Sequence, residues 1–389
     1  MINKYLCYFF LISLLACKSD QKNPVNVPEY NSNNFQTETK QIIDSISAIK
    51  ARTNFRHHPY ESGEKLKLIE KEVNIAKTNN DLPIKLYVEY GKALLNAGRS
   101  EDAIIVFEDI LTKLPENKII NNITKTLHEA LAISYMRLGE QKNCIENHSN
   151  ESCLFPIKGK GIHINKSGSQ KAITIYLSIL KVFPEDLQSR WLLNLAYMTL
   201  DEYPNKVPKQ FIIPPNVFQS EYDIDVFENI SMAVGLDING LAGGIILDDF
   251  NNDGYIDIMT STWGMFGSIR YFTNEANGNF TERSKEAGFE GLTGGLNMIQ
   301  ADYNNDGFLD FYVMRSAWSG YKILGQLPNS LIRNNGDGTF TDVTISSGMY
   351  AQHPTQSSVW FDFNSDGWLD LFVGNETHLA SEKNPSQLF

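Results

Sequence analysis

The sequence predicts a two-part protein, in which a solenoid of helical hairpins comes first and an all-β region of repeated short strands follows. Over residues 36–200, apolar residues recur at helical spacing, and Gly, Pro and Asn separate the segments. A stretch with four prolines, residues 203–215, rules out both a helix and a central strand. Beyond it, glycine becomes frequent and one pattern recurs three times. We therefore expect a linker over 201–226 and the β region over 227–389.

The bulk composition is that of a globular protein with room for two or three domains. The chain has 389 residues, of which 42% are hydrophobic and 21% are charged. Its formal net charge of -12 disfavours nucleic acid as a partner, because a phosphate backbone requires a basic stripe. The acidic surplus favours cations instead.

Residues 1–16 have the features of an export signal. Lys4 supplies a positive start, and a short apolar run over Leu6–Leu15 leads to small residues at a cleavage site. The run is too short to span a bilayer comfortably, and no other apolar stretch reaches that length. We therefore expect the mature protein to be exported and not to cross a membrane.

Cys17 directly follows Leu-Leu-Ala, and this arrangement resembles the lipobox of bacterial lipoproteins. The resemblance implies that Cys17 is acylated and becomes the mature N-terminus, in an outer-membrane lipoprotein that faces the periplasm or the surface. Residues 17–35 are polar without an apolar period, so we expect a flexible tether there. The alternative is a plain secreted protein with an incidental cysteine.

Two further cysteines, Cys144 and Cys153, form an even pair within an insertion over residues 140–169. In an oxidising compartment such a pair usually forms a disulfide, which is our prediction here. The same insertion carries two lysines and His163 within residues 158–163. These residues fit either a tethered surface loop or a recognition loop for an anionic group.

The segment Ile84–Asn117 resembles the tetratricopeptide repeat, a helix-turn-helix unit. Gly91, Ala103, Phe107 and Pro115 match the consensus in register. The small residues allow close helix approach, the phenylalanine fills the space between hairpins, and the proline ends the second helix. The resemblance implies an α-solenoid with a concave groove for peptides.

Other helical segments extend this stack. We expect the helix around Leu131 to pair with the helix around Tyr176, with the insertion between them. Leu187–Leu200 starts a third unit or a capping helix. Ile42–Ile49 and Leu66–Ile75 are predicted to form an earlier, degenerate pair.

The β region contains three copies of one pattern, with a period of 53 and then 60 residues. Each copy has room for four short strands, which is the size of a propeller blade. In each copy a phenylalanine lies eight residues before a glycine, and this glycine lies fourteen residues before an aspartate: Phe227, Gly235 and Asp249; Phe280, Gly288 and Asp302; Phe340, Gly348 and Asp362.

Each of these aspartates opens a loop with oxygen-bearing side chains at positions one, three, five and nine. Such alternation surrounds one hard cation, as in an EF-hand, with a glycine at position six for the bend and a backbone carbonyl from position seven. The flanking strands and the lack of a glutamate at position twelve exclude a true EF-hand. The predicted calcium ligands are Asp249, Asn251, Asp253, Tyr255 and Asp257; Asp302, Asn304, Asp306, Phe308 and Asp310; and Asp362, Asn364, Asp366, Trp368 and Asp370.

These loops and their companion motifs, Asn274–Phe280 and Asn334–Phe340, resemble the FG-GAP/VCBS repeat. The whole arrangement is similar to the cartilage-acidic-protein-like family, whose bacterial members join tetratricopeptide repeats to FG-GAP repeats and end in an ASPIC/UnbV domain, absent here. The resemblance implies a calcium-binding β-propeller with about three Ca²⁺ ions, mainly structural. The alternatives are acidic turns without metal, and calcium that bridges to a partner.

The propeller is expected to be incomplete. Alignment on the acidic loops places residues 386–389 opposite 330–333, inside a strand of the third blade. Closed propellers use about four to eight blades, so we expect the natural reading frame to continue through further repeats.

No catalytic residue is predicted. The sequence lacks HExxH and GxSxG motifs, and the repeat accounts for the acidic pairs as metal ligands. We therefore expect a non-enzymatic binding or scaffold protein of the cell envelope, with protein, peptide or glycan partners. The alternative is a hydrolase or other enzyme whose site lies in missing C-terminal blades.

Overall fold

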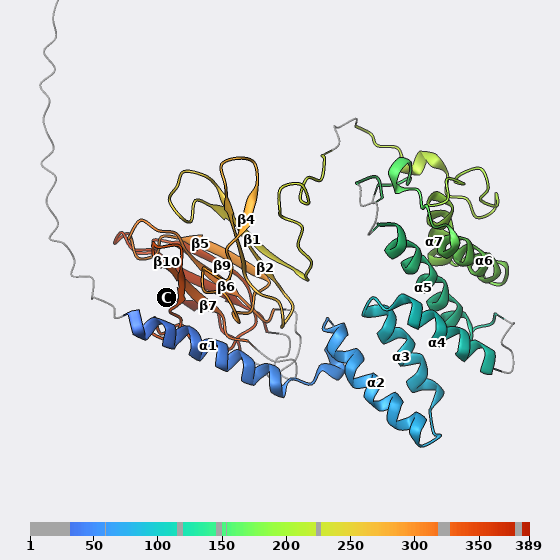
Figure 1. The fold of residues 1–389 in the computed structure, drawn as a ribbon, viewed down its shortest axis with the longest axis horizontal. Coiled ribbons are helices and arrows are strands. Elements are labelled where there is room, and N and C mark those ends of the chain that lie inside the picture. Colours follow the sequence, from blue (N-terminus) through green and yellow to red (C-terminus); the bar gives the residue numbers. More distant parts are fainter. Residues whose placement is uncertain are drawn as a thin grey trace, which may run out of the picture.

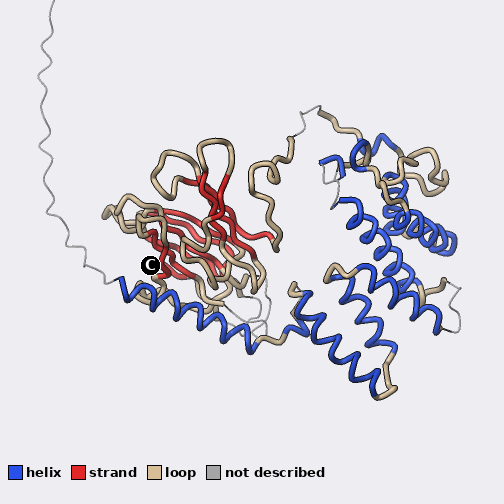
Figure 2. Tube along the Cα trace, viewed as in Figure 1, coloured by secondary structure: helices blue, strands red, loops and turns tan. Residues whose placement is uncertain are grey.

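The computed structural model describes residues 32–58, 60–114, 120–144, 150–152, 154–222, 227–317, 327–377 and 383–389. A helical half is followed by three antiparallel sheets, and this confirms the predicted order of the fold. Figures 1 and 2 show the helical region and the strands of the β half. The signal, Cys17, Pro115 and Cys153 lie outside the described residues, as does the Cys144 side chain. The predictions that rest on them stay predictions.

The helical half is a stack in which each helix packs on the next one along the chain. A single apolar cluster runs through the stack, as expected for repeated hairpins. Its helices are α2 Ser62–Thr78, α3 Ile84–Asn96, α4 Ser100–Lys113, α5 Lys125–Cys144, α6 Ser167–Val182 and α7 Leu187–Met198. Within the described ranges, none of the helices combines the length and hydropathy that a bilayer crossing requires.

Close packing explains two glycines of this stack, Gly91 and Gly168. A Cβ atom on Gly91 of α3 would lie 2.8 Å from the ring of Phe107 in α4, nearer than real Cβ atoms approach. A Cβ on Gly168 of α6 would lie 2.5 Å from the carbonyl oxygen of Tyr135 in α5. The predicted pairing of the helix around Leu131 with the helix around Tyr176 is therefore confirmed, despite the insertion between them.

The first helix, α1 (Ser32–Arg52), does not form the predicted pair with Leu66–Ile75, so that prediction is wrong. Ile42, Ile46 and Ile49 are buried among aromatic and methionine side chains of the sheets, and Figure 1 shows α1 lying along the β half. The prediction failed because three isoleucines on one helix face show that this face must pack on an apolar surface, but they do not show which element supplies that surface.

The predicted linker over 201–226 starts as part of the helical half. Val207 and Phe211 are buried in the helical cluster. The Asn194 side-chain amide of α7 donates to the Phe211 carbonyl at 2.9 Å and its oxygen accepts from the Ile213 amide at 3.0 Å. The proline-rich chain is thus packed on α7 up to about Ile213.

The β half consists of three antiparallel sheets, two with four strands and one with three. In sequence order, the strands of each sheet lie next to one another. The first sheet contains β1 Ala242–Asp248, β2 Asp257–Thr262, β3 Arg270–Asn274 and β4 Phe280–Glu282; the second contains β5 Asn297–Ala301, β6 Asp310–Met314, β7 Ser330–Asn334 and β8 Phe340–Asp342; the third contains β9 Thr355–Phe361, β10 Asp370–Asn375 and β11 Gln387–Leu388.

Two of the three repeated phenylalanines, Phe280 and Phe340, join neighbouring repeats, whereas Phe227 is exposed. Phe340 opens β8 and packs against Phe289 and Phe311, with ring centroids 5.2 Å and 5.8 Å away. Its backbone amide donates to the Ala287 carbonyl at 2.9 Å, and the Phe280 amide donates to the Val234 carbonyl at 2.9 Å. In each four-stranded sheet, the last strand is therefore bonded to the turn that precedes the first strand of the same sheet.

Candidate metal loops

Each acidic loop connects the first two strands of its sheet. The strand residues that flank the three loops pair directly: Asp248 with Asp257, Ala301 with Asp310, and Phe361 with Asp370. The antiparallel hairpin fixes the two ends of each loop, so position nine is always the first residue of the second strand.

The first loop folds around its own side chains. The two carboxylate oxygens of Asp249 accept hydrogen bonds from the amides of Asp253 at 3.0 Å and Gly254 at 2.7 Å. The Asn251 side-chain oxygen accepts from the same Asp253 amide, and Asp253 Oδ1 accepts from the Tyr255 amide at 2.9 Å. Oxygens of the predicted ligands thus organise the backbone at positions five to seven.

The other two loops repeat this geometry. The position-six amides of Gly307 and Gly367 each donate to the opening aspartate at 2.9 Å. The position-six φ values are 90°, 89° and 89°, a conformation that glycine adopts without strain. Position four is also left-handed, with φ of 57° at Asn252, 57° at Asn305 and 62° at Ser365, a feature that the sequence reasoning missed.

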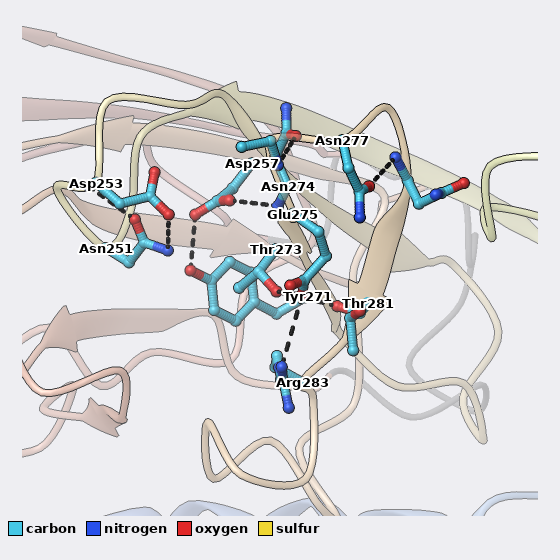
Figure 3. Close-up of polar contacts among 12 residues, drawn as sticks. Asn251, Asp253, Asp257, Tyr271, Thr273, Asn274, Glu275, Asn277, Thr281 and Arg283 are labelled. Carbon is cyan, nitrogen blue, oxygen red and sulfur yellow. Dashed lines mark hydrogen bonds and ion pairs between the residues drawn. The ribbon is translucent and has the colours of Figure 1, made fainter.

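Position nine lies deeper than the rest of the loop. Asp257 is fully buried. It accepts hydrogen bonds from the Tyr271 hydroxyl at 2.8 Å and the Asn274 amide at 2.9 Å, and Figure 3 shows both bonds. Burial raises the pKa of the Asp257 carboxyl, because a carboxylate loses hydration energy in an apolar surrounding. In the third loop, Asp370 Oδ2 accepts from the position-two amide of Phe363 at 2.7 Å.

Asp310 is the most unusual carboxyl of the three loops. Its side chain is fully buried, and Oδ1 accepts from the Asn334 amide at 2.7 Å, whereas no hydrogen bond of good geometry from the described residues reaches Oδ2, and the Tyr303 amide at position two interacts with the carboxyl only weakly. Burial, with a smaller contribution from the carboxylates of Asp306 and Asp302, raises the pKa of Asp310 to about 8, although the backbone amides of Asn334 and Tyr303 act in the opposite direction. A buried, unsatisfied oxygen beside two other carboxylates is a favourable environment for a cation.

The carboxylates are not already gathered into a cage. Among the described residues, no group of three or more His, Cys, Asp or Glu side chains is arranged to hold a metal ion. The oxygens at positions one, three and five accept backbone N–H groups instead, and each retains a lone pair for a further partner. The donor chemistry therefore fits calcium, while the individual ligand assignment stays a prediction.

The companion motifs support the loops from the neighbouring hairpin. The Asn274 side-chain amide donates to the Ile256 carbonyl at 3.1 Å. The Asn334 side-chain amide donates to the Leu309 carbonyl at 3.3 Å and to the Phe250 carbonyl at 2.8 Å. From the sequence, these motifs were assigned to tight turns, and their contacts with the loops were missed. The asparagine that begins each motif was the available signal, because its side-chain amide can donate to a backbone carbonyl.

The insertion after α5 does not present its histidine to solvent. His163 is buried, and its Nδ1 lies 3.2 Å from the Ser169 hydroxyl, which in turn lies 2.7 Å from the Thr199 hydroxyl. Burial lowers the pKa of His163. Lys158 and Lys160 are exposed, so an anionic ligand could contact the lysines of this loop and not the imidazole.

Comparison with known protein families identifies the repeats of the β half. A family profile described as FG-GAP-like repeat matches residues 249–313 and 322–373. The match begins at the first acidic loop and also includes the second and the third. No curated protein matches the chain at a significant level. The chain therefore carries FG-GAP-like repeats in its C-terminal part, preceded by a region with seven described helices.

Proposed function

We propose that the β half binds calcium through its three acidic loops, and that the bound ions stabilise a scaffold for recognition of other molecules. The single observation that carries the proposal is the buried carboxylate of Asp310 with its unsatisfied oxygen. Such a group destabilises the folded protein unless a proton or a cation compensates it. Calcium prefers oxygen ligands and is held in many FG-GAP repeats.

In the second loop, Asp302, Asp306 and Asp310 would supply three carboxylates, Asn304 an amide oxygen and Phe308 a backbone carbonyl. The corresponding residues of the other loops would do the same. A bound ion supplies positive charge that offsets the repulsion among these carboxylates. The chain itself holds the loop ends in a hairpin and fixes the backbone between positions five and seven. The proposed role of calcium is therefore mainly structural.

For the whole chain we propose a non-enzymatic, lipid-anchored binding or scaffold protein of the cartilage-acidic-protein-like family, anchored at the outer membrane through Cys17. Two features support this proposal. The helical stack has the hairpin packing of peptide-binding solenoids, and the sheets carry repeats that serve as interaction surfaces in other proteins. Protein, peptide or glycan partners fit these surfaces.

A calcium titration of the full chain tests the metal proposal. Calorimetry should detect binding, and calcium should raise the melting temperature of the wild type. Asp310→Asn should reduce the calcium-induced rise. Asp337→Asn is a matched control, because Asp337 lies in the companion turn of the same sheet and already accepts hydrogen bonds from Thr339. Absence of binding heat and of any temperature shift in the wild type would overturn the proposal.

A further inference from the structure

The three acidic loops are hydrogen-bonded to one another in series. The side-chain amide of Asn252, at position four of the first loop, donates to the position-six carbonyl of Gly307 in the second loop at 3.0 Å. Asn305, at position four of the second loop, donates to the Gly367 carbonyl of the third loop at 3.2 Å. Two successive loop junctions therefore contain the same bond in the same direction.

Each of these bonds acts on the peptide group that precedes a predicted metal ligand. The peptide between Gly307 and Phe308 has its N–H bound to Asp306 Oδ1 at 2.9 Å within its own loop. Its carbonyl is bound to Asn252 of the preceding loop. Both ends of this peptide are thus fixed, and a planar peptide also fixes the position of the Phe308 Cα, from which the Phe308 carbonyl extends.

The backbone conformation alone does not require asparagine at position four. Asn252 and Asn305 have φ of 57°, where asparagine is favoured among residues with a side chain. However, Ser365 has φ of 62° at the same position of the third loop. In the first two loops, asparagine therefore contributes a side-chain amide that donates to the next loop, in addition to tolerating this backbone conformation.

A second bond links the first two loops in the opposite direction. The Asn334 side-chain amide donates to the carbonyl of Phe250, at position two of the first loop. The Asn334 backbone amide also holds Asp310 Oδ1 at position nine of the second loop. The backbone of one loop and the carboxylate of the next are therefore joined through a single buried residue.

We propose that calcium binding is positively coupled along the three loops, so that an ion in one loop orders the peptide that precedes a predicted ligand residue of the next. This inference rests on the proposed calcium function. An ion bound by Asn251 and Asp253 would restrict Asn252 between them, and Asn252 would hold the Gly307 peptide in place. Because this peptide would already be ordered, calcium binding to the second loop would lose less conformational entropy. A smaller entropy loss for the second ion is the physical basis of positive cooperativity.

The test is a calcium titration of the full chain with three glycine variants. Asn252→Gly and Asn305→Gly keep the left-handed conformation and remove the inter-loop amide. Ser365→Gly is the matched control, because it makes the same type of change at a position without an amide. Wild type should bind with a Hill coefficient above one, and the Asn252→Gly, Asn305→Gly double variant should approach one. Loss of one neutral hydrogen bond should weaken binding about threefold to tenfold, and Ser365→Gly should bind like the wild type.

A metal-free measurement gives a second readout. Without calcium, hydrogen exchange at the Phe308 amide should be faster in Asn252→Gly, and exchange at the Trp368 amide should be faster in Asn305→Gly. Calcium binding without cooperativity in the wild type would overturn the coupling and leave the calcium proposal standing. Equal effects of all three glycine variants would also overturn it, and a wild type that binds no calcium would overturn both.

Discussion

Glu61, in the segment that joins α1 to α2, accepts a hydrogen bond at 2.5 Å from the backbone amide of Met265, in the connection between β2 and β3. Nearby, the Lys50 ammonium of α1 donates to the Thr293 hydroxyl oxygen at 2.7 Å. The Lys50 bond attaches the C-terminal end of α1 to the β half, the Glu61 bond attaches the segment that follows, and the buried isoleucines attach the middle of the helix. The first helix is therefore a structural part of the β half, although it precedes the helical stack in sequence.

The first prediction concerns this helix. Ile46→Ala should reduce the free energy of unfolding of the β half by about 2–5 kcal/mol, because Ile46 is fully buried among the sheets. Ile75→Ala in α2 is the matched control, since Ile75 is 55% exposed, and it should change stability by less than about 0.5 kcal/mol. Urea denaturation provides the measurement. Equal effects of the two substitutions would show that α1 does not stabilise the sheets.

The second prediction concerns the close approach of α3 and α4. Gly91→Ala should destabilise the helical stack by roughly 1–3 kcal/mol, because its Cβ would lie 2.8 Å from the Phe107 ring. In α2, a Cβ on Gly63 meets no atom within 4 Å. Gly63→Ala should therefore be neutral or stabilise by up to about 1 kcal/mol. The measurement is the melting temperature of each variant relative to the wild type. An unchanged melting temperature for Gly91→Ala would contradict the packing described for this hairpin.

Sequence periodicity was sufficient for the elements whose partners are neighbours in the chain. The helix around Leu131 and the helix around Tyr176 have matching small and aromatic residues, so their pairing could be predicted across the insertion. The position of α1 could not be predicted in this way. The isoleucine stripe required burial, but its partner surface is assembled from strands more than 190 residues away, as the contacts of Ile46 with the cluster containing Ile246 illustrate.

In the candidate site, too, features set by residues close in sequence could be predicted, and contacts between distant segments could not. The spacing of carboxylates within each loop predicted which residues could face one ion, because that geometry is local. The bonds from Asn252 to Gly307 and from Asn334 to Phe250 depend on how one sheet stacks on the next. No spacing rule within a single repeat contains that information.

The third prediction is a pH dependence in the helical stack. Burial lowers the pKa of His163 below the ordinary value of about 6.5, partly offset by Glu140, so the folded state keeps this imidazole neutral. As the pH falls through about 6.5, the unfolded chain takes up a proton first, and the folded state loses stability. Stability should therefore rise with pH up to about 6.5 and then level off with respect to this group.

His163→Gln should flatten this dependence, because glutamine can bond to Ser169 without titrating. His57→Gln is the control, because His57 is exposed, and it should keep the slope of the wild type. Urea unfolding at pH 5 and at pH 7.5 provides the comparison. A His163→Gln variant with an unchanged slope would show that the buried imidazole does not contribute to the acid sensitivity.

The last prediction concerns Arg315, which is the largest fully buried side chain among the described residues of the β half. Its guanidinium donates to the carbonyls of Thr293, Gly294 and Pro328 and to the Ser330 hydroxyl, at 2.6 to 3.1 Å. Burial lowers the pKa of Arg315 to about 10, and buried Asp342 acts in the opposite direction. The guanidinium N–H groups thus satisfy main-chain carbonyls in two segments, the one between the first two sheets and the one that leads into β7.

Arg315→Lys should destabilise the β half even though it preserves the charge, because a lysine ammonium cannot reproduce the planar set of five donors. Each carbonyl left unpaired should cost on the order of 1–3 kcal/mol. The matched control is Arg283→Lys, whose guanidinium forms an exposed ion pair with Glu275 at 3.5 Å and should lose less than about 1 kcal/mol. Chemical denaturation in calcium-free buffer isolates the effect from metal binding, and similar losses in the two variants would mean that the bonding geometry of Arg315 does not matter for stability.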